Sequence, residues 1–472
     1  MREFNQSYIH GRFVPVQGTT VLQSVNPSTE QTIAHTRLAN RDDAKLAIAA
    51  AKGAQPQLAG SSKSERIEML KQLEAAVLAR ADHIRDVTIE EYGGPVSRAQ
   101  WVSQYASQCF ARTAKILAGY EFTRHIGESV VHMRPVGVAA LIAPWNSVAG
   151  TICNKLASAI AAGCASVIKP SELSPWQTEV TAQALHAAGL PAGFFNILLG
   201  RGDDVGDELS TSADIAKISF TGSTSTGKII ARAAVDSMKR VSLGLTGKSA
   251  AIVLDDAPFA EAIGQALGAA FMNNGQACVA GTRLLVPRHR LEQVITLVQA
   301  HVSALRVGDP RDPATAIGPL ASRSQYERIQ HYIRRGLEQG ATLIAGGEGR
   351  PQGLQAGYFV KPTVFAHVDR DMDIAREEIF GPVLSILAYD NEADAIAMAN
   401  DSIYGLQAYV FSSNVQRAER LAQQLQAGAV LINRTMVDPL APFGGVKQSG
   451  LGRENGLFGL EAFLEPKAIV TV

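Results

Sequence analysis

The chain has 472 residues, too many for one ordinary hydrophobic core, and this length predicts two or three domains. Its 44 basic and 44 acidic side chains give a formal net charge of zero, which argues against a nucleic-acid-binding protein. Its four cysteines contain no CxxC pair, so a disulfide framework is not expected and a reducing, cytoplasmic setting is favoured. No apolar run resembles a secretory signal or a membrane span, so no membrane contact is expected.

The first 50 residues are mixed and rich in turns, and the pattern then becomes helical. Apolar residues at helical spacing predict helices over 64–80, 81–92 and 101–117. Apolar strands alternate with helices from about 136 to 235, and a second alternating series runs from about 250 to 433. Continuous apolar strands between helices predict parallel sheets that are covered on both faces.

We therefore predict an α/β protein with a doubly wound, parallel-sheet cofactor domain, a second α/β catalytic domain and a small oligomerisation β-sheet. The cofactor domain comprises residues 1–120 and 136–243, and the catalytic domain comprises residues 244–433. Segments 121–135 and 457–472 are expected to form the small sheet, in contact with another subunit, because an unpaired edge strand is otherwise a liability. Such a bridging sheet predicts a homodimer or a homotetramer.

Two segments suggest a nucleophile and an anion site. Cys278 follows a Gly-Gln-Ala loop in NNGQACV, and its thiolate would be reactive if backbone N–H groups lower the pKa of the thiol. A buried structural cysteine is the alternative. The glycines of FTGSTSTG, at 220–227, lie between a strand and a helix whose N-terminus can receive an anion. A plain tight turn is equally compatible with this spacing.

Two further segments follow predicted strands. In VIKPSE, Lys169 and Glu172 could bind ribose hydroxyls, and a carboxylate there favours NAD over NADP because it repels a 2′-phosphate. In PWN, Asn146 could donate a hydrogen bond to a developing oxyanion. A solvated Lys–Glu pair and an ordinary turn asparagine are the simpler alternatives.

In this order, the segments resemble the aldehyde dehydrogenase superfamily over nearly the whole chain. The resemblance rests on PWN at 144–146, IKPSE at 168–172, FTGST at 220–224, NNGQAC at 273–278, EEIFGPV at 377–383 and PFGGVKQSGLGRENG at 442–456. The NNGQAC motif resembles that of the hydrolytic branch of the family, whose members hydrolyse the thioester intermediate. The resemblance implies oxidation of an aldehyde to the carboxylic acid with NAD as hydride acceptor, through a thiohemiacetal and a thioester on Cys278.

The resemblance also implies roles for individual residues. Cys278 is the nucleophile, and Asn146 stabilises the oxyanion together with the backbone N–H of Cys278. The implied cofactor contacts are Lys169 and Glu172 at the adenosine ribose, Gly222 and Ser223 at the pyrophosphate, Glu378 at the nicotinamide ribose and Phe380 beside the nicotinamide. Further cofactor-binding positions are Ile142, Pro144, Trp145, Ser171, Gly202 and Leu245. No metal site is implied.

The resemblance breaks at the expected general base. The family has a Leu-Glu-Leu-Gly-Gly-Lys run whose Glu is that base, whereas this chain has LGLTGK at 243–248. Gly244 thus takes the place of the Glu, and Thr246 takes the place of a Gly. Because general-base catalysis contributes roughly 10²–10⁴-fold, deacylation of Cys278 is predicted to be slow.

Several explanations of Gly244 stay open. Glu454, in GRENG, matches a second carboxylate of the family and could replace the base, or it could simply form a salt bridge. The acyl group could instead pass to a thiol such as coenzyme A. The change could also leave an acyl-enzyme trap or a non-catalytic dinucleotide-binding protein, or meet a backbone requirement for glycine.

Small and polar residues beside PWN and PFGG, such as Ser147, Thr151 and Val437, predict an open pocket for a polar or bulky aldehyde.

Overall fold

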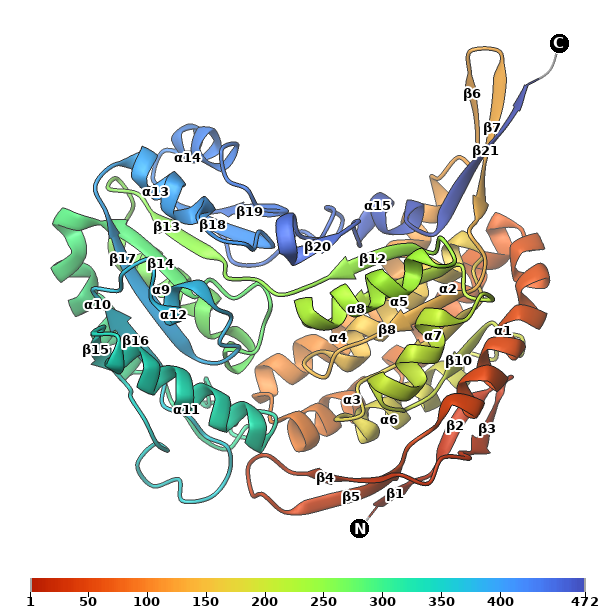
Figure 1. The fold of residues 1–472 in the computed structure, drawn as a ribbon, viewed down its shortest axis with the longest axis horizontal. Coiled ribbons are helices and arrows are strands. Elements are labelled where there is room, and N and C mark those ends of the chain that lie inside the picture. The colour runs from red at the N-terminus through yellow and green to blue at the C-terminus, as the bar shows by residue number, and fades with distance from the viewer. Residues whose placement is uncertain (1, 471–472) are drawn as a thin grey trace.

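Two separate β-sheets build the two lobes of the chain, and a third sheet projects from the first lobe as an arm (Figure 1). The computed structural model describes residues 2–470. The predicted α/β class, with parallel sheets covered by helices, is confirmed. Within residues 2–470, no helix combines the length and the apolar character needed to cross a membrane.

The first sheet has eight strands in the order β20-β12-β11-β8-β9-β10-β2-β3. They are β2 (Gln6–Ile9), β3 (Arg12–Pro15), β8 (Ala139–Ile142), β9 (Ser166–Lys169), β10 (Phe195–Ile197), β11 (Lys217–Thr221), β12 (Arg240–Gly244) and β20 (Gly450–Leu451). The five central strands are parallel. Strand order reverses between β8 and β11, and such sheets bind ligands at the carboxyl ends of the strands that flank this point.

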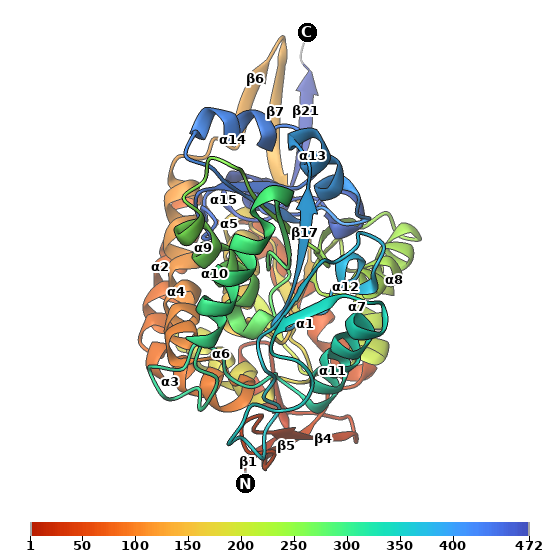
Figure 2. The ribbon, with the colours of Figure 1, turned by 90° about the vertical axis from the view of Figure 1, so that its left-hand side faces the viewer.

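Helices and helical turns cover both faces of this sheet (Figures 1 and 2). They are α1 (Arg41–Gly60), α2 (Lys63–Leu78), α3 (Ala81–Val87), η1 (Thr88–Tyr92), α4 (Val96–Ala118), α5 (Val148–Ala162), α6 (Pro175–His186), η2 (Gly202–Gly206), α7 (Asp207–Thr211) and α8 (Thr224–Val235). The central helix is α5, in which every residue except Thr151 and Asn154 is buried. Its alanine-rich surface lets α2 and α4 pack directly against it.

The second sheet has seven strands in the order β15-β16-β17-β14-β13-β18-β19. They are β13 (Ala250–Val253), β14 (Arg283–Pro287), β15 (Thr342–Ala345), β16 (Thr363–Ala366), β17 (Val383–Tyr389), β18 (Gln407–Phe411) and β19 (Ala429–Ile432). Its helices are α9 (Phe259–Phe271), η3 (Met272–Gly275), η4 (Arg288–Arg290), α10 (Leu291–Ser303), α11 (Arg323–Glu338), α12 (Asp373–Arg376), α13 (Glu392–Asn400) and α14 (Val415–Ala422). Ala250 and Ile252 pack into the core on one face, and Ala251 and Val253 into the core on the other.

The arm consists of β6 (Thr123–Ile126), β7 (Ser129–Pro135) and β21 (Leu464–Val470), as the predicted hairpin and tail strand required (Figure 2). Part of the predicted segment 457–472 lies elsewhere. Helix α15 (Gly456–Glu461) packs on α4 and α5, because Leu460 is completely buried in the first core. Residues 471–472 of that segment lie outside the described residues, as does residue 1 of the predicted cofactor domain.

The N-terminal region contains strands that the turn-rich sequence did not reveal. Besides β2 and β3, a three-stranded sheet is formed by β1 (Arg2–Phe4), β4 (Val21–Val25) and β5 (Thr32–Arg37). The turn between β4 and β5 reaches the second lobe. There the Glu30 carboxylate accepts hydrogen bonds from Arg323 at 2.6 Å, Arg350 at 2.8 Å and the backbone N–H of Gly357 at 3.0 Å. Part of the predicted segment 1–120 therefore contacts the second lobe as well as the first.

One short crossing joins the two sheets. Residues 244–249 lead from the carboxyl end of β12 to the amino end of β13. Later, η5 (Lys447–Ser449) and β20 return to pair with β12. The carboxyl ends of the first sheet consequently face the amino ends of the second, and the space between them is the place where both lobes can supply residues to one site.

Candidate active site

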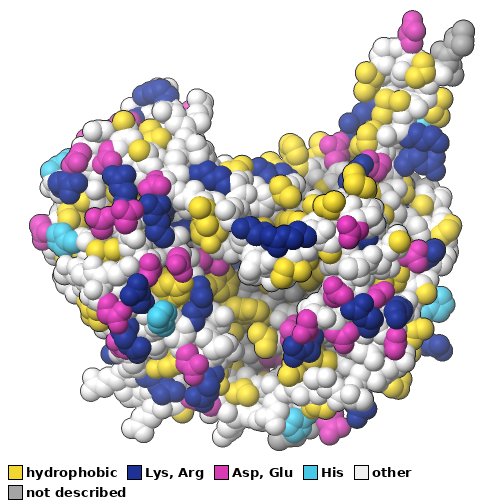
Figure 3. Space-filling view, viewed as in Figure 1, with side chains coloured by type: hydrophobic (Ala, Val, Ile, Leu, Met, Phe, Trp, Pro, Cys, Tyr) yellow, Lys and Arg dark blue, Asp and Glu magenta, His cyan; other side chains and the backbone are white. Residues whose placement is uncertain are grey.

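A cavity of about 720 Å³ lies between the lobes, and Figure 3 shows the surface hollowed there. This volume is typical of a small-molecule site. The cavity gathers predicted residues from both lobes, namely Pro144, Trp145, Asn146, Gly222, Ser223, Gly244, Leu245, Cys278, Glu378 and Phe380. They follow β8, β11 and β12 on one side and belong to loops of the second lobe on the other. These residues therefore meet at the carboxyl ends of the strands, where a doubly wound sheet is expected to bind its ligand.

Lys169 and Glu172 lie beyond the lining of this cavity, at the end of β9. The buried ammonium of Lys169 is 3.4 Å from Oε2 of Glu172 and 3.2 Å from the carbonyl oxygen of Pro170. Burial lowers the pKa of Lys169, while the charges of Glu172 and Asp203 oppose this shift. The two side chains form a partly buried pair instead of two freely solvated ones.

Three other predicted cofactor-binding residues do not line the cavity. Ile142 is buried within β8, because both faces of that strand are covered. The Ser171 hydroxyl accepts a hydrogen bond from the Leu173 N–H at 3.3 Å, as in a side-chain turn. Gly202 begins an exposed helical turn, and a Cβ built on it would meet nothing within 4 Å. Gly202 thus stands in open space, where a bound molecule could approach the backbone.

The loop that carries Cys278 has an uncommon backbone conformation. Asn273 and Asn274 have φ angles of 54° and 59°, in the left-handed region that asparagine tolerates better than most residues. The Asn274 amide donates to two backbone carbonyls at 3.1 and 2.9 Å. The Asn273 amide donates to the carbonyl oxygen of Asn146 at 3.1 Å. These two asparagines tie the nucleophile loop to its neighbours, including the predicted oxyanion residue.

The side chains that support this loop could not be identified from the sequence. Oη of Tyr92 donates to the Asn273 carbonyl oxygen at 3.1 Å and accepts from the Gln276 amide at 3.1 Å. Nε of Arg98 donates to the side-chain oxygen of Asn273 at 3.2 Å. The available signal was the NNGQ run, since consecutive amide residues beside a glycine are typical of a loop held by side-chain hydrogen bonds. Tyr92 and Arg98 lie about 180 residues earlier and gave no such signal.

The amide of Asn146 faces this loop. Its Nδ2 donates to the carbonyl oxygen of Gln276 at 2.8 Å, and an amide nitrogen carries a second hydrogen. That second N–H, together with the backbone N–H of Cys278, can donate to an oxygen bound next to the thiol. Behind them, the rings of Trp145 and Phe380 meet edge to face with centroids 5.4 Å apart. The site therefore combines an apolar wall with hydrogen-bond donors beside the sulfur atom.

The protonation of Cys278 differs from the prediction. Burial and, to a smaller extent, the nearby charge of Glu378 raise the pKa of the thiol to about 12. The backbone N–H groups of Cys278 and Val279 act in the opposite direction but are weaker. The condition for a reactive thiolate, a pKa lowered by backbone N–H groups, is therefore not met, because desolvation of the thiolate outweighs the dipoles of the turn. At neutral pH the nucleophile is a thiol and needs a proton acceptor.

Alkylation of Cys278 should therefore depend steeply on pH. Below the pKa, the thiolate fraction rises about tenfold per pH unit, so the labelling rate with iodoacetamide should rise without a plateau from pH 7 to 9. Glu378→Gln removes a negative charge and should lower the pKa of Cys278, which speeds labelling at pH 8. Peptide mass spectrometry checks both results, with buried Cys153 as an internal control. A plateau below pH 8 would contradict the raised pKa.

Glu378 lies in the loop before β17, and its carboxylate faces the same cavity. Burial raises its pKa to about 7. The backbone N–H of Gly247, 3.2 Å from Oε1, the Thr246 hydroxyl and the charge of Lys248 all favour the ionised form and limit that rise. Glu378 can consequently exist in both protonation states at neutral pH, which is the condition for efficient proton exchange.

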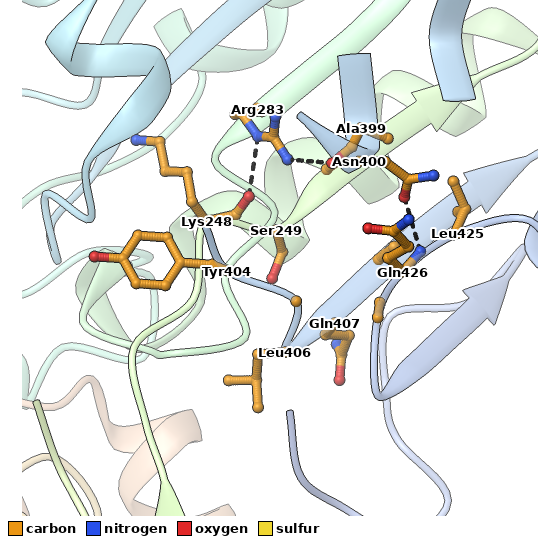
Figure 4. Close-up of a pocket in the computed structure, with 14 residues that line it drawn as sticks. Lys248, Ser249, Arg283, Ala399, Asn400, Tyr404, Leu406, Gln407, Leu425 and Gln426 are labelled. Carbon is orange, nitrogen blue, oxygen red and sulfur yellow. Dashed lines mark hydrogen bonds between the residues drawn. The ribbon is translucent and has the colours of Figure 1, made fainter. Parts of the chain in front are cut away.

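Lys248 ends the LGLTGK run next to this carboxylate. Its buried ammonium has no hydrogen-bond partner within residues 2–470, and burial lowers its pKa to about 7. Figure 4 shows its side chain pointing away from Arg283. The Arg283 guanidinium instead donates to the carbonyl oxygens of Lys248 at 3.0 Å and of Ala399 at 2.8 Å. Arg283 thereby fixes the backbone of the crossing, and Lys248 contributes a variable charge near Glu378.

Gly244 lines the cavity at the carboxyl end of β12. A Cβ built there would lie 3.5 Å from Oγ1 of Thr221 and 3.9 Å from the carbonyl oxygen of Phe220, which are ordinary contact distances. Its φ is not in the left-handed region. A backbone requirement for glycine is therefore wrong as an explanation of Gly244. The residue instead leaves the cavity without a side chain at this point.

Gly247 is different, because a Cβ there would lie 2.3 Å from the carbonyl oxygen of Cys278. Gly247→Ala should displace the nucleophile loop and cost roughly 1–3 kcal/mol, as overpacking does. Gly244→Ala, a matched change three residues away, should leave the unfolding temperature nearly unchanged. Thermal unfolding of the two variants measures the difference, and equal melting temperatures would contradict the close packing at Gly247.

Glu454 lies apart from the main cavity, in a small space beside α5. Its Oε1 accepts hydrogen bonds from the buried ammonium of Lys155 and from Oγ of Ser219, the latter at 3.1 Å. This carboxylate oxygen therefore already has two hydrogen-bond partners, and the side chain lines a different cavity from Cys278. These contacts favour the salt-bridge interpretation of Glu454 over its role as a replacement base.

Within the described part of the chain, no group of His, Cys, Asp and Glu side chains is placed to hold a metal ion.

A cysteine presented by one α/β lobe to the strand ends of a doubly wound sheet defines a class of two-lobed, dinucleotide-dependent enzymes. Residues 13–469 match the model described as the aldehyde dehydrogenase family, and the chain belongs to that family. A Pseudomonas protein named 3-succinoylsemialdehyde-pyridine dehydrogenase is 43% identical over 100% of this chain and 99% of its own length.

Two solved structures share this fold closely. One is a variant of aldehyde dehydrogenase C from Pseudomonas syringae in complex with NAD+ and octanal. It has a TM-score of 0.97 and 41% identity over 99% of this chain and 96% of its own. The other is a Mycobacterium tuberculosis aldehyde dehydrogenase in complex with NAD+. It has a TM-score of 0.96 and 37% identity over 100% of this chain and 99% of its own. The predicted family and fold are thus confirmed.

Proposed function

We propose that the protein oxidises an aldehyde to the carboxylic acid with NAD as hydride acceptor, through a covalent intermediate on Cys278. The observation that carries this proposal is the single cavity that holds Cys278, Asn146 and Glu378 at the strand ends of the first sheet. The NAD+ complexes of the Pseudomonas syringae and Mycobacterium tuberculosis relatives support the same cofactor here.

The residues of the first lobe fit a dinucleotide. A Cβ on Gly222 would lie 2.4 Å from the ring of Phe220, so only glycine leaves the backbone open to a pyrophosphate. The adjoining N-terminus of α8, capped by Ser223, offers backbone N–H donors to phosphate oxygens. Lys169 and Glu172 provide a cation and a carboxylate for ribose hydroxyls. The carboxylate disfavours a 2′-phosphate and supports NAD over NADP.

The proposed chemistry divides one difficult oxidation into two steps. Sγ of Cys278 bonds to the aldehyde carbon, while the Asn146 amide and the Cys278 N–H donate to the developing oxyanion. Bound NAD supplies the hydride acceptor, which leaves a thioester on the sulfur. Water then attacks the thioester carbon, the C–S bond breaks and the acid leaves. We propose that Glu378 and Phe380, which line the same cavity, contact the ribose and the ring of the nicotinamide.

The gap at Gly244 bears on the second step. Without a carboxylate there, we propose that deacylation limits turnover. The same gap favours a second candidate, transfer of the acyl group from Cys278 to a thiol such as coenzyme A, because nothing within 3.4 Å blocks the space at Gly244. A dinucleotide-binding protein without catalysis is the third possibility, and the retained cavity argues against it.

The proposed substrate is an aldehyde with an aromatic or long apolar tail. One relative is named for a pyridine semialdehyde, and another was solved in complex with octanal. Both support this class of substrate. On α4, the rings of Trp101 and Tyr105 stack with centroids 4.8 Å apart. A Cβ built on Gly150, near the start of α5, would lie 3.1 Å from the Tyr105 ring and 3.1 Å from Oγ of Ser147, so Tyr105 stands near the residue that follows Asn146. An aromatic surface of this kind suits a flat or apolar tail.

Rapid mixing with NAD and aldehydes tests the proposed function. We expect a burst near one NADH per subunit, slow turnover afterwards and an acyl adduct on Cys278 by intact mass. Gly244→Glu should raise the steady-state rate by roughly 10²–10⁴-fold, whereas the matched Gly244→Ala should not. Acceleration by coenzyme A alone would support the thiol acceptor. Absence of NADH with every aldehyde of a broad panel would refute the oxidation.

We also propose a cytoplasmic homodimer or homotetramer that associates through the arm. Ile126, Ile469 and Val470 are 61%, 43% and 71% exposed, and apolar side chains are visible on the arm in Figure 3. The outer strands β6 and β21 each present an unpaired edge. Exposed apolar side chains beside free strand edges favour pairing with another chain. The four free cysteines are compatible with a reducing compartment.

Substitution on the arm tests this assembly. Ile469→Glu should lower the mass measured by analytical ultracentrifugation, because it places a charge in an apolar contact. Leu337→Glu, on α11, is a matched control, since Leu337 is also 43% exposed but lies away from the arm. An oligomer that survives Ile469→Glu intact would count against the arm as the interface.

A further inference from the structure

The LGLTGK run contains two unusual residues, and the structure connects them. Gly244 leaves the cavity without a carboxylate at the end of β12. Two residues later, Thr246 adds a hydroxyl whose Oγ1 accepts a hydrogen bond from the Thr224 N–H at 3.3 Å. The same hydroxyl faces the carboxylate of Glu378 and favours its charged form. Thr246 thus contacts a carboxylate of the same cavity in which Gly244 supplies no carboxylate.

Gly247 lies between Glu378 and the nucleophile. Its N–H donates to Oε1 of Glu378 at 3.2 Å, and a Cβ built on it would lie 2.3 Å from the carbonyl oxygen of Cys278. One glycine therefore separates the carboxylate from the loop that carries the sulfur. Oε1 of Glu378 accepts this N–H, the Thr246 hydroxyl faces the same carboxylate, and the side chain lines the cavity that holds Cys278, so the carboxylate can receive a proton from a molecule bound there.

The other acidic residue of the cavity is Glu377, and one of its carboxylate oxygens is engaged. The carboxylate of Glu377 accepts a hydrogen bond from the hydroxyl of Tyr332. Arg328 donates to the backbone carbonyl oxygen of Glu378 at 2.6 Å, which fixes the backbone and leaves the carboxylate free. Both glutamates line this cavity, and Glu378 is the one whose carboxylate is bonded to Gly247, which packs against the Cys278 loop.

Several charges surround the Glu378 carboxylate. Lys248 and Arg328 favour its ionised form. Cys278 and Tyr404 are the titratable neighbours whose own protonation responds to its charge. Burial opposes ionisation and brings the pKa of Glu378 to about 7, where it can take up and release a proton without a large cost.

We propose that Glu378, positioned by Thr246, is the proton acceptor for the water that hydrolyses the thioester on Cys278. The proposal rests on the proposed function, because that function forms the thioester. The water oxygen bonds to the thioester carbon while one water proton passes to the carboxylate of Glu378. The C–S bond then breaks, and Cys278 leaves as a thiolate with the electron pair. Glu378 returns the proton to the sulfur, so the site regains its starting state.

Ester hydrolysis without NAD separates this role from cofactor binding. With p-nitrophenyl acetate, nitrophenolate is released as Cys278 is acetylated, and steady-state hydrolysis then reports deacylation. Glu378→Gln should lower the steady-state rate by roughly 10²-fold or more while the nitrophenolate burst and the acetyl adduct on Cys278 persist. A persistent burst also shows that the variant is folded. No change in the steady-state rate would overturn the proposal.

Restoring a glutamate at 244 supplies the sharpest control. In a Gly244→Glu background, Glu378→Gln should reduce steady-state ester hydrolysis by less than about threefold, since two bases that serve the same step are not additive. An equal loss in both backgrounds would mean that Glu378 acts only on the structure of the cavity. That result would overturn the proposal.

Thr246→Gly provides an independent readout. Removing the hydroxyl withdraws a contact that lowers the pKa of Glu378, so the pH midpoint of deacylation should shift upward. A purely structural effect would lower the rate without moving the midpoint and would count against Thr246 as a positioning residue. If ester hydrolysis depends on Glu378 but no aldehyde yields NADH, the inference stands and the proposed oxidation fails.

Discussion

The short crossing from β12 to β13 is the constraint on which the site depends. The chain leaves β12 at Gly244 and enters β13 at Ala250, and between them Gly247 has no room for a side chain beside the carbonyl of Cys278. Arg283 holds the end of this crossing by donating to the carbonyl of Lys248. Because the crossing contacts both the nucleophile loop and the Glu378 loop, its sequence sets the chemistry on both sides of the cavity.

Desolvation controls the ionisable groups around this crossing. Burial raises the pKa of Cys278 to about 12 and that of Glu378 to about 7, and it lowers the pKa of Lys248 to about 7. All three shifts favour neutral forms, as expected where charge is poorly hydrated. A buried site of this kind stabilises charge only through directed hydrogen bonds, such as those from the Asn146 amide and the backbone N–H of Gly247.

Sequence analysis predicted the features that depend on local pattern. The alternation of apolar strands and helices predicted the parallel sheets, and the position of PWN and FTGST after strands indicated that Asn146 and Gly222 lie at strand ends. Strand β12, which brings Gly244 to the same edge, was not predicted. Strands β1 to β5 escaped notice, because they are three to six residues long with mixed exposure. The pKa of Cys278 could not be predicted, since desolvation arises from packing between distant segments.

Gly244 and Thr246 illustrate why a missing residue needs a structural test. From the sequence, Gly244 subtracts a function and Thr246 is a neutral replacement. In the structure, the space at Gly244 would accept a side chain, so the glycine is not forced by the backbone. Thr246 instead contacts Thr224 and faces Glu378, which links the start of α8 to the far wall of the cavity. Gly244, Thr246 and Glu378 therefore border the same cavity, and Thr246 contacts Glu378 although the two residues lie more than 130 positions apart in the chain.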